Sequence, residues 1–250
     1  MEVRDILCYF SYKYKGNWND IYRAIKCKEP INYDEYQKIM ENSNYNAITI
    51  LDETYPEQFK NVEKPPFVVF YYGDISLLKS PMISVIGTRR PSEFGIVATK
   101  KVVKHLVSKN YVIVSGLACG IDGVAHKAAI DEGGKTIAIL GSGIDLCYPK
   151  SNMKLYNEIR KNHLVLSEYP IDILPQKINF PFRNRLIASL GEKIVVTEAY
   201  ANSGTSITVN YGLQMNRDIC CISFPAFAHS FNNTLIKEGA TLIDDVDDLL

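Results

Sequence analysis

From residue 82 to residue 224, short apolar runs alternate with segments of helical periodicity, and this alternation limits the possible folds more than any other feature. An apolar run without polar alternation is typical of a strand that is buried on both faces, and the intervening helices supply the covers. The sequence therefore predicts an α/β protein with a doubly wound, mostly parallel sheet of the extended Rossmann-like type. The predicted strands are MISVIG (82–87), YVIVSG (111–116), TIAILG (136–141), HLVLSE (163–168), KIVVTEA (193–199) and DICCISF (218–224).

The segments that flank this alternation predict smaller additions to the fold. Residues 46–74 contain a strand, a short helix and a second strand that would extend the sheet, and the last ten residues contain a short strand and an acidic helical turn. Residues 1–45 show helical patches and predict a small helical N-terminal region. We therefore expect two parts, residues 1–45 and a Rossmann-like domain over residues 46–250.

The overall composition is that of an ordinary globular protein, with 46% hydrophobic and 22% charged residues. The N-terminus lacks a signal-peptide pattern, and no apolar run approaches the roughly 18 residues that span a bilayer. A cytoplasmic protein without membrane contact is expected. The six cysteines include no C-x-x-C pair and no Cys/His cluster with zinc spacing, so neither a structural disulfide nor a metal site is expected.

The charges are unevenly distributed along the chain, although they sum to zero. Residues 80–190 contain 15 Lys or Arg against 8 Asp or Glu, whereas residues 191–250 contain 3 against 8. A basic middle between acidic ends indicates an anionic partner for the middle.

Loops rich in glycine and small hydroxyl residues follow four of the predicted strands. In an open parallel sheet, ligands bind at the carboxyl ends of the strands, where free backbone N–H groups can hold an oxyanion. The fingerprints of nucleotide cofactors are missing, because Leu146 stands where a dinucleotide motif needs its third glycine and Ala129 where a phosphate-binding loop needs its first. No cofactor is expected. The four loops are GTRRPSEFG (87–95), SGLACGIDGVAH (115–126), GSGIDLCYP (141–149) and TEAYANSGTSIT (197–208).

Candidates for catalysis are few. Asp122 and His126 lie four residues apart on one predicted helix face, but Asp122 is close to the helix start, which favours a capping and packing role. Glu168 and Glu198 end predicted strands, and a carboxylate pair could act in hydrolysis. Of these candidates Glu198 is the strongest.

Cationic and aromatic residues on the same predicted edge form a clearer pattern. Arginine makes forked hydrogen bonds to phosphate, and aromatic rings stack on unpaired bases, so the pattern favours single-stranded nucleic acid. In FPFRNRLIASL (180–190), Arg183 and Arg185 would stand at a helix start, where the helix dipole opposes them unless an anion binds. Because residues two apart diverge by about 200° on a helix, we expect Arg183 to face the nucleic acid and Arg185 to hold the loop or a carboxylate such as Glu198. The other members are Arg89, Arg90, Tyr148, Lys150, Tyr169, Lys177, Phe180 and Phe182.

Seven motifs, taken in order, resemble the DNA-processing protein A (DprA or Smf) family over about three quarters of the chain. The resemblance implies a protein without enzymatic activity that protects incoming single-stranded DNA in natural transformation, loads the RecA recombinase and forms homodimers. Many members also carry a C-terminal winged helix, which is not expected here. The motifs are VIGTRRPS, SGLACGIDGVAH, TIAILGSGIDLCYP, SEYP, FPFRNRLIASL, VVTEAYANSGTSIT and NNTLIKEGATLI.

The same resemblance implies which residues would contact the DNA phosphates in a pocket over the strand ends. Lys150 and Arg217 are additions outside the central set. The implied residues are Arg89, Gly141, Ser142, Lys150, Lys177, Phe180, Arg183, Asn184, Arg185, Ser203, Gly204, Thr205 and Arg217.

Two other hypotheses stay open. The TEAYANSGT segment is similar to the glutamate and Gly–Thr turn of nucleotide N-glycosidases, so a Rossmann-type nucleotide sensor or an N-glycosidase is the alternative, although the Pro-Gly-Gly entry of those enzymes is missing. The third hypothesis is a regulatory protein that acts only through protein contacts.

Overall fold

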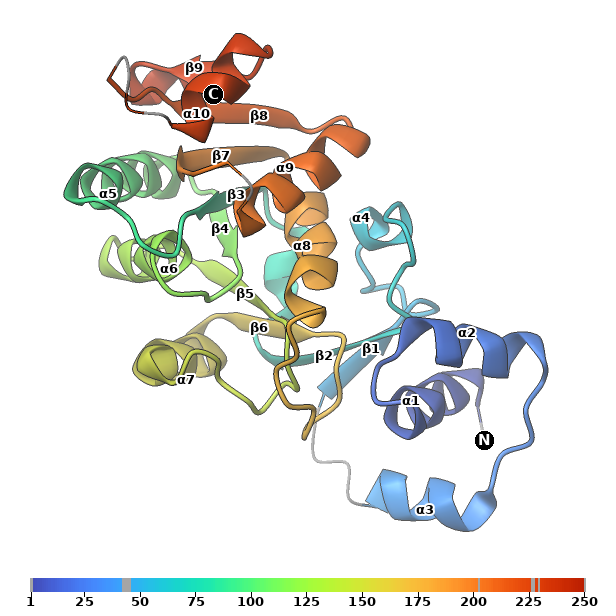
Figure 1. The fold of residues 1–250 in the computed structure, drawn as a ribbon. Helices are drawn as coiled ribbons and strands as arrows, with labels where there is room; N and C mark the ends of the chain where they lie inside the picture. Colours follow the sequence, from blue (N-terminus) through green and yellow to red (C-terminus); the bar gives the residue numbers. More distant parts are fainter. Residues whose placement is uncertain (1, 42–45, 202, 226–227, 229, 250) are drawn as a thin grey trace.

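The computed structural model describes residues 2–41, 46–201, 203–225, 228 and 230–249. These residues form a nine-stranded sheet in the order β1-β2-β6-β5-β4-β3-β7-β8-β9 (Figure 1). The strands from β3 to β9 pair in parallel, and β2 is antiparallel to both of its neighbours, β1 and β6. The predicted fold class is confirmed, and the six predicted strands correspond to β3–β8. The strands are β1 Asn46–Thr49, β2 Val68–Gly73, β3 Met82–Gly87, β4 Val112–Ser115, β5 Thr136–Leu140, β6 Leu164–Ser167, β7 Lys193–Glu198, β8 Asp218–Ile222 and β9 Thr241–Ile243.

Helices cover both faces of the sheet, as Figure 1 shows. One face is covered by α5, α6 and α7, and the other by α4, α8, α9 and α10. The bounds are α4 Glu57–Lys60, α5 Glu93–Ser108, α6 Ile121–Asp131, α7 Met153–Asn162, α8 Asn179–Leu190, α9 Gly204–Gln214 and α10 Phe231–Lys237, with short 3₁₀ helices η1 Ile75–Lys79, η2 Lys150–Asn152 and η3 Val246–Leu249.

The central strand β3 explains why the apolar runs show no polar alternation. Its Met82 and Ile86 point into the core shared with α8, and its Ile83 and Val85 point into the core shared with α5 and α6. Successive side chains of a strand point to opposite faces, so a strand covered on both faces needs apolar residues at nearly every position.

The winding of the sheet reverses beside β3. From β3 the strands β4, β5 and β6 follow one another in one direction, whereas β7, β8 and β9 follow one another in the other direction. A reversal of this kind leaves a crevice at the carboxyl ends of the two strands that flank it, here β3 and β7.

The N-terminal helices pack against the edge of the sheet, as expected for a helical appendage. Leu7 and Cys8 share a core with Phe70 of β2, and the indole Nε1 of Trp18 donates to the carbonyl oxygen of Pro65 at 2.7 Å. The expected boundary at residue 45 lies outside the described residues. The helices are α1 Val3–Lys13, α2 Trp18–Lys26 and α3 Tyr33–Glu41.

Two further expectations concern the cysteines and membrane-spanning helices. All six cysteines have free thiols, and Cys220 and Cys221 are buried in β8, as the apolar run around them predicts. Among the described residues, none of the helices combines the length and the apolar character that crossing a membrane requires.

Candidate nucleic-acid interface

A cavity of about 390 Å³ lies at the carboxyl ends of β3 and β7, where the winding of the sheet reverses. We call it the strand-end cavity. Its wall consists of the end of β3, the loops after β3, β4 and β7, the first turn of α6, one side of α8 and the first two turns of α9. The lining residues are Ile86, Gly87, Thr88, Arg89, Arg90, Ala118, Asp122, Arg183, Asn184, Ile187, Tyr200, Ser203, Gly204, Thr205 and Thr208.

The rim beside this cavity combines a cation with aromatic rings. Arg89 is exposed in the loop after β3, and its guanidinium carbon lies 5.9 Å from the ring centroid of Phe180. The ring of Phe180 in turn lies 5.4 Å from that of Tyr148, which is exposed. A guanidinium next to two rings can bind a phosphate and stack on an unpaired base.

Gly141 allows Phe180 to take this place. A Cβ atom on Gly141 would lie 2.8 Å from Cδ1 of Phe180, so a larger residue would displace the ring. Ser142 contributes less than expected, because its side chain is buried and its hydroxyl donates to the carbonyl oxygen of Leu146 at 2.8 Å.

The first turn of α9 supplies the second wall of the cavity. Helix amides in the first turn have no intrahelical acceptor, and the helix start carries partial positive charge. Gly204 and Thr205 line the cavity, so their amides are potential donors to an anion. The hydroxyl of Ser203 is buried and has no hydrogen-bond partner among the described residues. The Asn184 side chain donates to the carbonyl oxygen of Gly204 at 3.2 Å and so joins α8 to this turn.

Arg183 lies on the floor of the cavity rather than at a free helix start. Its side chain is only 3% exposed, and its Nη1 donates to the carbonyl oxygens of Gly116, at 2.8 Å, and Ile139. Burial lowers the pKa of Arg183 to about 10, while Asp122 opposes this and the nearby Arg89 adds to it. The expected position of Arg183 at a helix start is wrong, whereas its contact with DNA stays a prediction, since the residue does line the cavity.

Arg183 is not at a helix start because α8 begins earlier than the sequence predicts. The helix starts at Asn179, so Pro181 lies within its first turn, where the missing N–H of proline is tolerated. Arg183 and Arg185 are therefore in the second turn, and the predicted conflict with the helix dipole does not arise, because the dipole acts mainly on the first turn.

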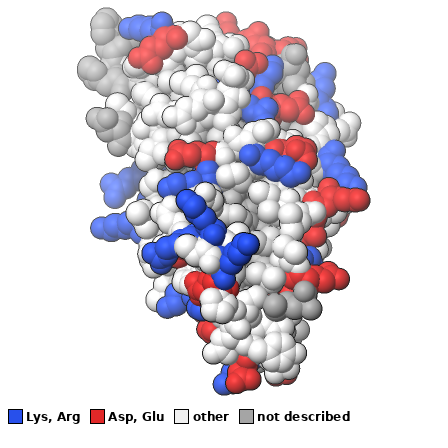
Figure 2. Space-filling model, turned by 90° about the vertical axis from the view of Figure 1, so that its right-hand side faces the viewer, with Lys and Arg blue, Asp and Glu red and all other residues white. Residues whose placement is uncertain are grey.

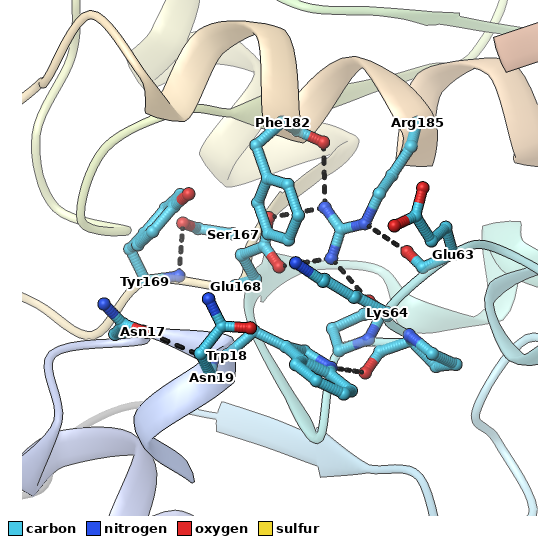
Figure 3. Close-up of polar contacts among 12 residues, drawn as sticks. Asn17, Trp18, Asn19, Glu63, Lys64, Ser167, Glu168, Tyr169, Phe182 and Arg185 are labelled. Atoms are coloured by element: carbon cyan, nitrogen blue, oxygen red, sulfur yellow. Dashed lines mark hydrogen bonds and ion pairs between the residues drawn. The ribbon is translucent and has the colours of Figure 1, made fainter. Parts of the chain in front are cut away.

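Arg185 is buried completely and ties three segments together (Figure 3). Its guanidinium forms a forked ion pair with Glu168, at 2.9 and 2.7 Å, and donates to the carbonyl oxygens of Glu63 and Lys64. Burial alone would lower the pKa of Arg185, but the Glu168 carboxylate raises it. Arg185 holds a loop and a carboxylate as predicted, but the carboxylate is Glu168 and not Glu198. The implied contact of Arg185 with DNA phosphates is wrong, because the side chain is 0% exposed and its guanidinium is paired.

The other cationic candidates differ in position. Lys150 at the start of η2 and Lys177 before α8 are exposed at the same edge of the sheet but do not line the cavity. Arg217 immediately precedes β8, so it lies at the amino ends of the parallel strands, opposite the cavity. Its Nη2 donates to the carbonyl oxygen of Ser189. Its expected place on the rim is wrong, and its position before a strand was the signal against it. Sequence reasoning also omitted Thr88 and Tyr200, which line the cavity directly after β3 and β7.

The catalytic candidates do not form an acid–base pair in this cavity. His126 is fully buried, and its Nδ1 lies 2.6 Å from the Thr136 hydroxyl, while Asp122 accepts the backbone N–H of Ala118 at 3.3 Å. Burial raises the pKa of Asp122 and lowers that of His126 to about 3. Both side chains therefore have packing roles, as the sequence favoured.

The carboxylates of Glu168 and Glu198 bind different partners and do not form a pair with each other. Glu198 accepts the backbone N–H of Ser92 at 2.8 Å, the Ser92 hydroxyl at 3.0 Å and the Tyr200 hydroxyl at 2.9 Å. The region that the structure describes contains no group of three or more His, Cys, Asp or Glu that could hold a metal ion.

Comparison with known proteins identifies the family. The sequence model described as DNA recombination-mediator protein A matches residues 46–250. The chain belongs to this family of DNA recombination mediators. It is 40% identical over 219 residues to the DNA processing protein DprA of Streptococcus pneumoniae, a match that covers 87% of this chain and 77% of that protein.

Two solved structures of DprA proteins resemble this fold. The structure of DprA from Streptococcus pneumoniae has a TM-score of 0.81 at 34% identity and covers 98% of this chain and 92% of that one, so the match includes the N-terminal helices. A structure of DprA from Helicobacter pylori, described by its mode of binding single-stranded DNA, has a TM-score of 0.76 at 29% identity and covers 83% of this chain and 94% of that one.

Proposed function

We propose that this protein binds single-stranded DNA through the strand-end cavity and its rim, and that it acts as a recombination mediator. In this role it protects incoming single strands in natural transformation and loads the RecA recombinase onto them, in the cytoplasm and as a homodimer. The observation that carries the proposal is the combination of exposed Arg89, the Phe180 ring beside it and the open first turn of α9 around one cavity.

The chemistry of this combination suits a flexible polyanion. The arginine and the helix amides can hold phosphate oxygens, and an aromatic platform accepts any base, since every base has a stacking face. The single-stranded DNA binding described for the Helicobacter pylori protein supports the same assignment, because that protein shares the fold.

An enzymatic role is less well supported. The Glu198 carboxylate accepts three hydrogen bonds from Ser92 and Tyr200, which hold it in a structural position. We propose that the protein acts without catalysis and without a cofactor. Release of free base from a nucleotide panel, abolished in Glu198→Gln, would instead support the N-glycosidase alternative.

Fluorescence anisotropy with a labelled single-stranded oligonucleotide at several salt concentrations tests the proposal. Arg89→Ala is expected to weaken binding for all sequences and to reduce the slope of log K against log salt by about 0.7, which is the value for one phosphate contact on a single strand. Lys104→Ala is the matched control, because its side chain is 69% exposed on α5, away from the cavity.

Absence of binding by the wild-type protein at low salt would refute the proposal. Equal affinities of the Arg89→Ala and Lys104→Ala variants would instead place DNA binding outside the strand-end cavity. Sedimentation of the protein alone and with RecA checks the proposed homodimer and the proposed partner.

A further inference from the structure

A second cavity, of about 680 Å³, lies between the N-terminal helices and the segment that leads into α8. We call it the interlobe groove. Figure 3 shows part of it, where Asn17, Trp18 and Asn19 approach Lys64, Tyr169 and Phe182. Its lining residues are Tyr14, Lys15, Gly16, Asn17, Trp18, Asn19, Asp20, Lys64, Tyr169, Asp172, Ile173, Leu174, Gln176, Ile178, Asn179 and Phe182.

One buried side chain in this groove lacks a partner. Asn179 is only 6% exposed, and its Nδ2 has no hydrogen-bond partner among the described residues. Leaving a buried polar group unsatisfied destabilises the folded state, so a group of this kind in a cavity wall indicates a site where a ligand can bind.

The helix to which Asn179 belongs, α8, has no side-chain cap at its start beside the groove. Asn179 is the first residue of α8, whose first turn has neither a side-chain cap nor an acidic residue. The Asn179 amide donates to the carbonyl oxygen of Gln176 at 3.0 Å and Pro181 has no N–H, but the start of this 12-residue helix still carries partial positive charge that no acidic side chain offsets. The buried carboxamide and the helix start therefore independently favour an anionic, hydrogen-bonding ligand.

The charges in the groove leave two cations available. Figure 2 shows Lys and Arg side chains gathered near the middle of the face that the right-hand side of Figure 1 presents. Lys15 lies exposed in the α1–α2 turn, and the ammonium group of Lys64 lies 5.9 Å from the Trp18 ring centroid. Neither forms an ion pair with a carboxylate in the described part of the chain. Of the two acidic side chains in the lining, Asp20 is paired with Arg23 at 2.8 Å, and Asp172 remains.

The rest of the lining suits a nucleobase. Asn17, Asn19 and Gln176 add three more carboxamides to that of Asn179, although the Oδ1 of Asn17 already accepts the backbone N–H groups of Asn19 and Asp20. A carboxamide offers both donors and an acceptor, as the edge of an unpaired base does, which makes this side chain a common reader of base edges.

The interlobe groove and the strand-end cavity lie on neighbouring faces of α8. Asn179 and Phe182 line the groove, whereas Arg183 and Asn184 line the cavity. A helix with its side chains is about 10–12 Å across, and exposed Lys177 lies at the start of the same helix. A single strand that crosses the start of α8 can therefore reach both.

We propose that the interlobe groove binds a nucleotide of the same DNA strand that occupies the strand-end cavity. This inference rests on the proposed function. Lys15, Lys64 and the start of α8 hold the phosphate, and the carboxamides contact the base edge. The N-terminal helices thereby lengthen the DNA site instead of serving only as an appendage.

The test uses a backbone-matched set of substitutions. Lys15 and Lys64 have φ angles of 53° and 57°, and Lys28, which is exposed and does not line the groove, has a φ angle of 52°. Asparagine tolerates this left-handed conformation, so lysine to asparagine removes the charge without added backbone strain. The double variant Lys15→Asn/Lys64→Asn is compared with the control Lys28→Asn.

Each protein is titrated with labelled single strands of about 4 and about 16 nucleotides, the range of site sizes known for single-strand binding folds. For the long strand, the double variant is expected to reduce the salt slope by about 1.4, which is two phosphate contacts. Its affinity deficit relative to the control then grows about sevenfold between 200 and 50 mM salt. The short strand covers less of the path across the two sites, so the deficit of the double variant is expected to be smaller with it than with the long strand.

Equal salt slopes of the double variant and Lys28→Asn with the long strand would overturn this inference, while wild-type binding would still support the proposed function. If the wild-type protein bound neither strand, the proposed function would fail with it. A titration with dAMP tests whether the groove binds a free nucleotide instead of a nucleotide of the DNA strand. Tight dAMP binding that is lost in the double variant, without a change in long-strand affinity, would assign the groove to a free nucleotide and refute the inference.

Discussion

Removing the Arg185 guanidinium should destabilise the protein more than removing any exposed cation of the rim. Arg185 is 0% exposed and Glu168 is 4% exposed, so Arg185→Met leaves a buried carboxylate without its counter-charge. The substitution keeps a side chain of similar length, and the cost therefore comes mainly from the lost charge and hydrogen bonds rather than from an empty volume.

The expected magnitude follows from this burial. Breaking a buried ion pair by removing one partner costs about 3–5 kcal/mol. Arg185→Met also leaves the carbonyl oxygens of Glu63 and Lys64 without a donor, so a value of about 4 kcal/mol is expected. For a chain of this size, this loss corresponds to a Tm lowered by about 8–16 °C.

Urea unfolding and thermal unfolding of Arg185→Met, Glu168→Gln and the double variant measure this cost. Because the double variant contains neither charge, its destabilisation should be at least 1 kcal/mol smaller than the sum of the single values, on the order of couplings between contacting residues. Below its Tm, Arg185→Met should retain the salt slope of DNA binding, whereas Arg89→Ala should not. A cost below about 1 kcal/mol, or additive single effects, would refute the buried pair as the link between α8 and the end of β6.

Two further predictions concern stability. The pKa of His126 is lowered to about 3 in the folded protein, so the unfolded chain takes up a proton as the pH falls below about 6.5, and about 2 kcal/mol of stability should be lost between pH 7 and pH 5. Urea unfolding at both pH values should show this loss in the wild type and little of it in His126→Gln, and an equal loss in the two proteins would contradict the cause. Gly120→Ala should cost roughly 2 kcal/mol more than Gly133→Ala, because both glycines have positive φ but only a Cβ at Gly120 meets an atom, the carbonyl oxygen of Thr88 at 2.3 Å. Equal destabilisation of the two variants would show that the loop after β3 moves freely away from α6.

Sequence reasoning succeeded where a local signal had one physical meaning. Arg89 follows a predicted strand and a glycine, and a residue in that place must lie at the carboxyl edge of a parallel sheet. The same rule, applied to Arg217, would have excluded it from the rim, because it precedes β8.

The roles of Arg183 and Arg185 depended on contacts far apart in the sequence. Arg183 donates to Gly116, which is 67 residues away, and Arg185 to Glu63, which is 122 residues away. No periodicity or spacing in FPFRNRLIASL indicates that both guanidinium groups are buried, since arginine is normally exposed. The position of Pro181 in the first turn of α8 was hidden as well, because a helix start with proline resembles a loop that ends in proline.

The sequence by itself determined the doubly wound sheet, because uninterrupted apolar runs between helices can be buried in few other ways. It also determined the edge at which an anion can bind, through glycine, hydroxyl and arginine residues placed directly after strands. Only the tertiary structure decided which cations are free: it places Arg183 on the floor, Arg185 in an ion pair and Arg89 at the surface. The interlobe groove also depends on the tertiary structure alone. It lies between segments separated by more than 140 residues. Their contact depends on the packing of the N-terminal helices against the sheet and not on any local pattern.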